Sequence, residues 1–83
     1  MRKPEVTERD LELMYRIWKY RGYLTSWVVE DGIYGESYDY TTKRLMTLSK
    51  RKLIDRREVE NKRWPRGVCW YLLKNGIETL LEA

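Results

Sequence analysis

The chain contains no histidine and no phenylalanine, and its only cysteine is Cys69. A single thiol cannot form a disulfide within the chain, and without histidine it cannot complete a zinc site. Histidine is also the commonest general base in enzymes, and the sequence has neither a glycine-rich phosphate loop nor paired carboxylates in a pocket-forming context. We therefore expect no metal, no cofactor and no catalytic activity, and we interpret Cys69 as a small buried hydrophobe in a strand.

Long apolar runs are lacking as well. No segment approaches the ~20 apolar residues that a membrane-spanning helix needs, and residues 1–7 lack the apolar stretch of a signal peptide. Together with the lone cysteine, this predicts a soluble, cytoplasmic protein with no membrane partner. The 83 residues are expected to form one domain, 1–83, with a thin core that depends on the four tryptophans and seven tyrosines.

Basic residues are concentrated in one part of the chain. Residues 43–66 carry a net charge of +7 and the remainder carries −3, so the total of +4 hides a strong segregation. A run of charges is often only a solvated face, and that interpretation stays open. A continuous positive region beside an acidic remainder nevertheless favours a surface that binds a polyanion.

Apolar spacing predicts a first helix that begins after Thr7 and ends before Gly22. Thr7 and Asp10 have the spacing of a capping box, with aspartate in place of the usual glutamate. The apolar residues that recur at helical spacing are Leu11, Met14, Ile17 and Trp18. This segment is therefore expected to be an amphipathic helix with one face in the core.

A short second helix is predicted after Thr25-Ser26, which can provide its N-cap. In this helix Val29 and Ile33 would face inward, and the glycines at positions 32 and 35 would weaken and then end it. The residues from Trp27 to Val29 also have the composition of a strand, so that alternative stays open.

A third helix is predicted over 38–50, with Ser37 or Asp39 as its cap. The residues of its narrow apolar stripe are Thr41, Leu45, Leu48 and, through its aliphatic stem, Lys52. On the opposite side fall Asp39, Lys43, Met46, Thr47 and Lys50, with Tyr40 and Thr42 on the flanks. Because only one side of this helix is apolar, its other side is available to meet a ligand.

After position 52 the pattern changes from helical to strand-like. Leu53–Glu60 and Val68–Leu73 are rich in β-branched and aromatic residues, and the segment 61–67 between them contains the proline and glycine of a turn. We therefore expect a two-stranded β-hairpin. Asn75-Gly76 is expected to break the chain before a last helix, Ile77–Glu82, which turns Ile77, Leu80 and Leu81 inward.

This order of elements is that of a winged helix-turn-helix domain, an α+β fold that is mostly helical. It would consist of a three-helix core, a two-stranded β-hairpin wing and a short C-terminal helix. The chain resembles replication-relaxation-type winged helices, which are associated with plasmid and mobile-element replication. The segments that carry the resemblance are Thr7–Leu11, Tyr23–Thr25, Thr42–Leu45, Leu48 and Leu53–Arg57.

A broader resemblance is to the small winged-helix repressors of the multiple-antibiotic-resistance type. Two positions depart from the pattern of these families. Lys52 stands where they usually place the glycine that ends the recognition helix, and Leu73 replaces the threonine that usually caps the last helix.

The resemblance implies that the helix over 38–50 is a recognition helix that enters the major groove of duplex DNA. The side chains that would reach base edges are those of Tyr38, Tyr40, Thr42, Lys43 and Thr47. Lys43 can donate to O6 and N7 of guanine, whereas Arg44 can instead pair with Asp10 or Glu36 within the fold. For the two tyrosines, packing against the second helix stays open as an alternative.

Further basic residues would contact the DNA backbone. Those outside the turn are Lys50, Arg51, Arg56 and Arg57, each of which can instead be merely solvated. In the turn 61–67, which would be the wing, Lys62, Arg63 and Arg66 are suited to phosphates or to the minor groove. Trp64 in the same turn can fold back beside Trp70, lie along a sugar edge or contact a protein.

Together these features predict sequence-specific binding of double-stranded DNA, by a small transcriptional regulator or by a replication or partition accessory factor of a plasmid or virus. The alternative is a protein-interaction module that docks a partner through the third helix or through Trp64. A homodimer is expected, because one such module buries little surface on DNA. Its contacts would come from Tyr15, Trp18 and the segment 77–83.

Overall fold

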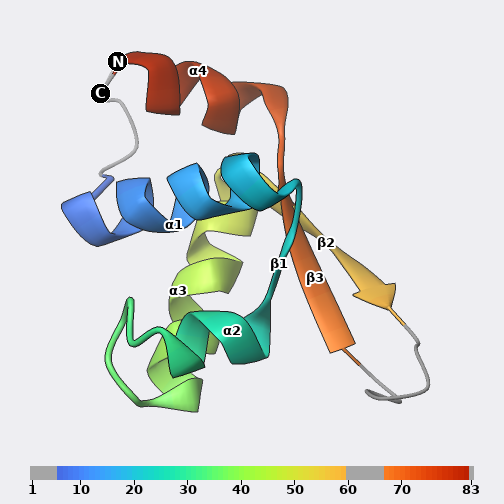
Figure 1. Cartoon of the computed structure of the whole chain (residues 1–83). Coiled ribbons are helices and arrows are strands. Elements are labelled where there is room, and N and C mark those ends of the chain that lie inside the picture. The colour runs from blue at the N-terminus through green and yellow to red at the C-terminus, as the bar shows by residue number, and fades with distance from the viewer. Residues whose placement is uncertain (1–5, 60–66, 83) are drawn as a thin grey trace.

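Short strands lie between and beside the helices along the chain. The computed structural model describes residues 6–59 and 67–82. Within these residues it shows an α+β fold of four helices and one three-stranded antiparallel sheet (Figure 1). In chain order the elements are α1 (Glu8–Tyr20), β1 (Tyr23–Leu24), α2 (Thr25–Glu30), α3 (Tyr38–Lys50), β2 (Ile54–Val59), β3 (Gly67–Leu72) and α4 (Lys74–Glu82). No helix in this described part has the length and apolar character that crossing a membrane requires.

The bounds of α1 follow from local signals in the sequence. Thr7 Oγ1 accepts a hydrogen bond from Asp10 N at 3.2 Å, and Asp10 Oδ2 accepts one from Thr7 N at 3.0 Å, so the predicted capping box is present. The helix ends at Arg21, whose φ of 57° is left-handed, directly before Gly22. Its buried apolar side chains are Leu13, Met14 and Ile17, whereas Trp18 is exposed, contrary to the predicted stripe.

The short helix α2 is present, but its inward face differs from the prediction. Thr25 is its first residue rather than its cap, and the hydroxyl of Thr25 accepts a hydrogen bond from Trp70 Nε1 at 2.8 Å. With Thr25 fixed in the interior, Val28 is fully buried and Val29 is only partly buried. Ile33 is buried as expected, but it lies beyond the end of the helix.

The sheet has three strands in the order β1-β3-β2, and the prediction of a two-stranded hairpin is therefore incomplete. The hairpin itself is confirmed, with β2 antiparallel to β3 and Ile54 opposite Leu72. The additional strand β1 pairs on the other side of β3, with Tyr23 opposite Trp70. Two residues are too short a stretch to show the alternating pattern by which strands are recognised in a sequence.

The core lies between the helices and one face of this sheet. Tyr23, Ile54 and Trp70 supply the buried apolar side chains of the strands. Leu45 and Leu48 supply those of α3. Among the residues that the structure describes, the buried apolar ones are Leu13, Met14, Ile17, Tyr23, Val28, Ile33, Tyr34, Leu45, Leu48, Leu53, Ile54 and Trp70. On the opposite face of the sheet Tyr71 is exposed and donates a hydrogen bond to Asp55 at 3.1 Å.

The last helix begins three residues earlier than predicted. Asn75-Gly76 does not break the chain, because both residues lie in the first turn of α4. Gly76 is buried against the backbone of Leu53, so this glycine allows a close approach between two elements rather than a turn. Leu80 is partly buried as expected, but Leu81 points outward and is exposed.

Helix α3 matches its predicted range, and Ser37 rather than Asp39 is its N-cap. Its end differs from the prediction, because Lys52 leaves the apolar stripe and is exposed, with a left-handed φ of 62°. The N–H of Lys52 donates to the Ser49 carbonyl at 3.0 Å, and the N–H of Leu53 donates to the Leu48 carbonyl at 3.1 Å. This is the Schellman arrangement, in which the left-handed position usually belongs to glycine.

Lys52→Gly is expected to raise the free energy of unfolding by about 0.5–1 kcal/mol, because glycine has no Cβ to oppose a left-handed backbone. Lys50→Gly is the matched control, since it removes the same side chain from the last helical turn and should lower the stability by about 1 kcal/mol. Urea denaturation followed by circular dichroism measures both. Two substitutions that shift the midpoint in the same direction would contradict this account of the helix end.

Candidate nucleic-acid interface

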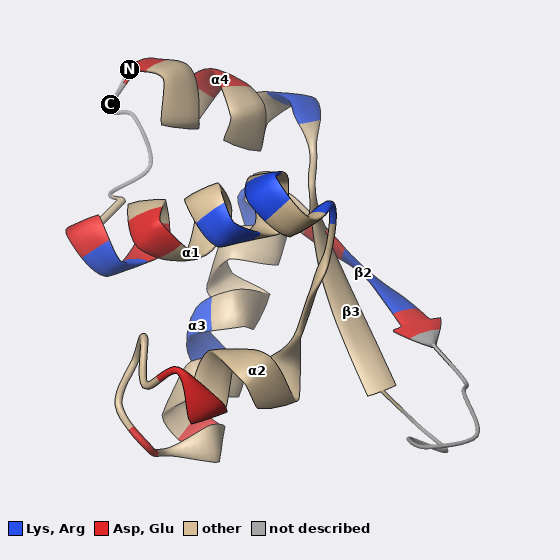
Figure 2. Cartoon of the chain, viewed as in Figure 1, with Lys and Arg blue, Asp and Glu red and all other residues tan. Residues whose placement is uncertain are grey.

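The outward side of α3 is fixed by what the helix buries. Thr41, Leu45 and Leu48 have no solvent exposure and face the core. The helical repeat therefore turns Lys43 and Lys50 toward solvent, and both are exposed. Figure 2 shows basic residues on α3 and β2, with acidic residues also on β2 and near the start of α3.

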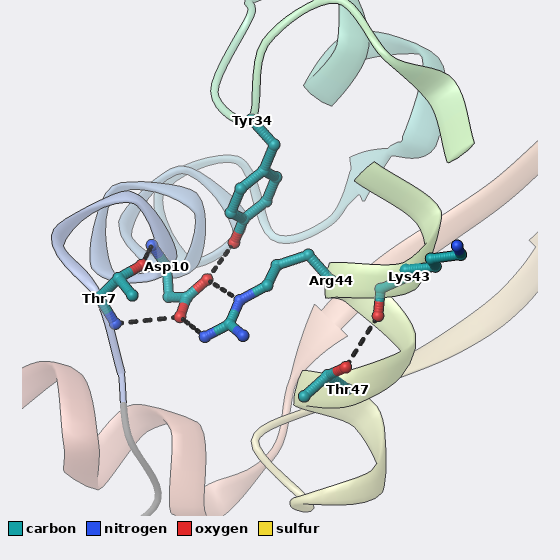
Figure 3. A network of polar contacts seen from close by, with 6 residues as sticks. All are labelled: Thr7, Asp10, Tyr34, Lys43, Arg44 and Thr47. Carbon is teal, nitrogen blue, oxygen red and sulfur yellow. Dashed lines mark hydrogen bonds and ion pairs between the residues drawn. The ribbon is translucent and has the colours of Figure 1, made fainter. Parts of the chain in front are cut away.

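Arg44 does not belong to this outward side, because it is tied to α1. Its Nε donates to Asp10 Oδ1 at 2.9 Å, and its Nη2 donates to Asp10 Oδ2 (Figure 3). Tyr34, from the segment between α2 and α3, donates its hydroxyl proton to Asp10 Oδ1 at 2.5 Å. One carboxylate therefore joins three parts of the chain, as the sequence suggested for Arg44 and Asp10.

The Asp10 carboxylate is buried and nonetheless ionised. Burial by itself would raise the pKa of Asp10, but the hydrogen bonds from Arg44, Tyr34 and the Thr7 N–H outweigh it and lower this pKa below its ordinary value. The same carboxylate raises the pKa of Arg44 through its hydrogen bonds, against the opposing effect of burial. Burial, together with the bond to Asp10, raises the pKa of the Tyr34 hydroxyl. The network is therefore an ion pair at neutral pH, with a neutral tyrosine beside it.

Lys43 is the neighbour of Arg44 but points away from the network (Figure 3). Within residues 6–59 and 67–82 no carboxylate forms a salt bridge with Lys43. Thr47 lies one turn later, and its hydroxyl donates to the Lys43 carbonyl at 2.9 Å. Because its proton is already used, this hydroxyl can only accept a hydrogen bond, which suits the amino groups of adenine or cytosine.

The other predicted base contacts on α3 are placed differently. Thr42 is half-buried and its Oγ1 has no contact with solvent, so the hydroxyl is not presented on the outer surface as expected. Tyr40 forms an edge-to-face contact with the Tyr34 ring at 6.2 Å between centroids, although half of it stays exposed. Tyr38 is 60% exposed at the start of the helix. Of the two tyrosines, Tyr38 is therefore the more accessible to a ligand.

The predicted backbone contacts do not all share one surface. Arg56 is opposite Trp70 in the sheet and Arg57 is opposite Cys69, so the two arginines project from opposite faces. Arg57 lies on the outer face with Tyr71, and Arg56 lies on the face that the helices cover. Arg51 follows the end of α3 and is half-buried. Lys62, Arg63, Trp64 and Arg66, the predicted wing contacts, lie outside the described residues.

A polar hollow adjoins the network of Asp10. It has a volume of about 450 Å³ and is lined by Thr7, Glu8, Arg9, Tyr34, Tyr40 and Arg44.

Tyr34, the third member of the network, was not singled out from the sequence, because a tyrosine in a glycine-flanked loop gives no sign that it will be buried. No group of three potential metal ligands gathers anywhere in the described part of the chain.

Comparison with models of protein families, with curated proteins and with solved structures finds no match for this chain. The function of the α3 surface must therefore be inferred from its own geometry and charge. Between Tyr38 and Val59 the chain has seven basic and three acidic residues, and Arg44 is the one that pairs with Asp10. An excess of basic residues in one stretch of the chain is a usual feature of polyanion-binding proteins, and the exposed lysines on the outward side of α3 are Lys43 and Lys50.

Proposed function

We propose that the chain is a winged helix-turn-helix domain that binds double-stranded DNA. The succession of α1, α2 and α3, followed by the β2–β3 hairpin, supports this assignment, with α2 and α3 as the helix-turn-helix pair. In such a pair the second helix lies in the major groove and its early residues contact base edges. Here that helix is α3, and the hairpin would be the wing.

The observation that carries the proposal is the contrast between Lys43 and Arg44. These two adjacent residues of α3 have different surroundings. Arg44 fixes α3 to α1, and Lys43 extends from the same turn into solvent. The helix is thus held rigidly while a basic side chain is offered outward, which is how a recognition element is positioned for a ligand. Lys50, two turns further along the same side, would contact phosphate, and Lys43 would donate to guanine.

The double reversal Lys43→Glu/Lys50→Glu is expected to weaken binding to duplex DNA by at least about 30-fold, because two donors become anions that face the phosphates. The magnitude of the slope of log affinity against log salt should fall by roughly 1 unit, because Lys50 is the one of the two that is assigned to a phosphate. Fluorescence anisotropy with a labelled duplex, selected from random sequence, measures both quantities. The expected biological setting is transcriptional regulation, or replication or partition of a mobile element.

A matched control separates contact from net charge. The single reversals Lys43→Glu and Lys19→Glu change the net charge by the same amount, and Lys19→Glu, at an exposed lysine of α1, should alter the affinity by less than about threefold. Circular dichroism establishes that each variant is folded. Equal losses in the Lys43 variant and the Lys19 control would mean that binding reflects overall charge, and unchanged binding in the double reversal would remove α3 from the interface.

One observation favours a second candidate function, docking of a partner protein. Asp39 is exposed in the first turn of α3, and Ser37 provides the N-cap, so capping does not account for the carboxylate. An exposed anion at this place would oppose a phosphate, although it also interacts favourably with the helix dipole. Retention on heparin or mixed genomic DNA at about 0.15 M salt would support DNA binding, and passage without retention would support the protein-docking function.

A further inference from the structure

A second surface of the molecule is apolar, and it lies between α1 and α4. An apolar hollow of about 200 Å³ is lined by Tyr15, Trp18, Ile77, Leu80 and Leu81. Large parts of these side chains face solvent: Leu81 is 80% exposed, Trp18 57% and Tyr15 49%. Isolated exposed apolar residues are ordinary, but a contiguous group around a hollow marks an interaction site. We call this surface the α1/α4 patch.

We propose that the α1/α4 patch binds the same patch of a second copy of this chain, in a two-fold symmetric dimer. The exposed parts of the patch amount to roughly 400 Å² of apolar surface, if aromatic side chains count about 200 Å² each and aliphatic ones somewhat less. A standard interface buries about 800 Å² per partner, of which a little more than half is apolar. The patch therefore supplies about the apolar area that one side of a stable dimer needs.

Charges of both signs flank the patch and make it self-complementary. On α1, Glu12 and Lys19 lie three and four residues from Tyr15, and on α4, Lys74 and Glu78 lie beside Ile77 and Leu81. In a two-fold interface residue i of one copy meets residue j of the other, and j meets i. Each helix thus carries both an acid and a base at the edge of the patch, as expected of a polar rim around an apolar centre. Within one chain Glu12 also pairs with Arg16 at 3.1 Å.

The charged surface of α3 and β2 is less suited to a second copy. The stretch from α3 through β2 has an excess of four positive charges, so two copies that met there would repel each other. The α1/α4 patch lacks such an excess. Its shape is also complementary to itself. Leu81, the most exposed of its side chains, can enter the partner's hollow between Trp18 and Ile77.

The dimer is tested without DNA, so its failure is distinct from failure of the proposed function. Sedimentation velocity of the full chain at about 10–100 µM should give the mass of a dimer. Leu81→Lys should raise the dissociation constant of the dimer by about tenfold or more, because it places a charge in the apolar centre of the interface. The variant should stay folded by circular dichroism, since Leu81 contributes little to the core of a single chain.

Tyr20→Lys is the matched control. Tyr20 is also an exposed apolar residue of α1, 59% exposed, but it does not line the hollow. The substitution makes the same change of charge and should leave the mass of the dimer unchanged. A wild-type chain that is monomeric throughout this range would overturn the proposal. So would a dimer that resists Leu81→Lys, or one that Tyr20→Lys disrupts equally.

Discussion

Asp10→Asn is expected to lower the free energy of unfolding by about 2–4 kcal/mol at pH 7. The substitution keeps the size of the side chain but removes the charge that Arg44 and Tyr34 share. Asp10 has no exposed surface, so water cannot reach this position and replace the lost carboxylate as a partner of Arg44 and Tyr34. The guanidinium of Arg44 retains 21% exposure, and for this reason the loss should be smaller than for a fully buried pair.

The loss of stability caused by Asp10→Asn should become smaller as the pH falls. The pKa of Asp10 is lower in the folded chain than in the unfolded chain, so the folded state favours the ionised form. Its contribution is complete above the unfolded pKa of about 4 and disappears as the pH falls through the lower folded value. The difference in stability between wild type and Asp10→Asn should therefore be constant above about pH 5 and should narrow in more acidic solution.

Glu8→Gln is the control for this experiment. Glu8 is in the same first turn of α1 and is exposed, so the loss of its charge should cost less than about 0.5 kcal/mol. A double-mutant cycle of Asp10→Asn with Arg44→Gln should give a coupling energy of about 1–3 kcal/mol. Urea denaturation at several pH values measures all of these. Equal midpoints for the Asp10 and Glu8 variants, or a coupling near zero, would contradict the role of the network.

Gly76→Ala is expected to destabilise the chain by about 2–3 kcal/mol, although alanine is the better helix former. A Cβ at position 76 would overlap the carbonyl oxygen of Leu53 and would lie 3.0 Å from Leu72 Cδ2. The Leu53 carbonyl cannot easily move, because it also accepts a hydrogen bond from the Leu73 N–H at 3.0 Å. The start of α4 would have to shift away from the sheet.

The neighbouring position provides the comparison. Asn75 is exposed in the same turn of α4, so Asn75→Ala gains helix propensity without a steric conflict and should stabilise the chain by up to about 0.5 kcal/mol. Thermal unfolding by circular dichroism should therefore give shifts of opposite sign for the two alanine substitutions. A Gly76→Ala chain as stable as wild type would mean that α4 is not held against Leu53.

The sequence predicts the features that arise from neighbouring residues. The capping box at Thr7 and the apolar repeat of α3 are local signals, and both helices occur where these signals place them. The features that it does not predict arise from contacts between distant residues. Gly76 has the appearance of a helix breaker until the Leu53 carbonyl is beside it, and β1 is defined only by its pairing with β3.

The same division applies to the candidate site. Helical geometry places Arg44 at the margin of the apolar stripe of α3, where it can pair within the fold. The sequence left Asp10 and Glu36 open as its partner, and the structure shows Asp10. The burial of the Thr42 hydroxyl depends on packing, which spacing alone does not reveal. A strand turns Arg56 and Arg57 to opposite faces, but which of them lies on the face of Trp70 depends on the register. Lys43 and Lys50 were expected to face outward, and their exposure in the structure agrees with that expectation.

The pairing of β1 with β3 has a consequence for the order in which the chain folds. The hydrogen bond from Trp70 to Thr25 joins residues 45 positions apart, and the same tryptophan fills the core beneath α2. Contacts between such distant residues form late, because a long loop must close first. During synthesis the helical part would emerge before the strand that completes its core. The core beneath α2 should therefore be complete only after Trp70 has been synthesised, whereas the contact between Arg44 of α3 and Asp10 of α1 needs no part of the hairpin.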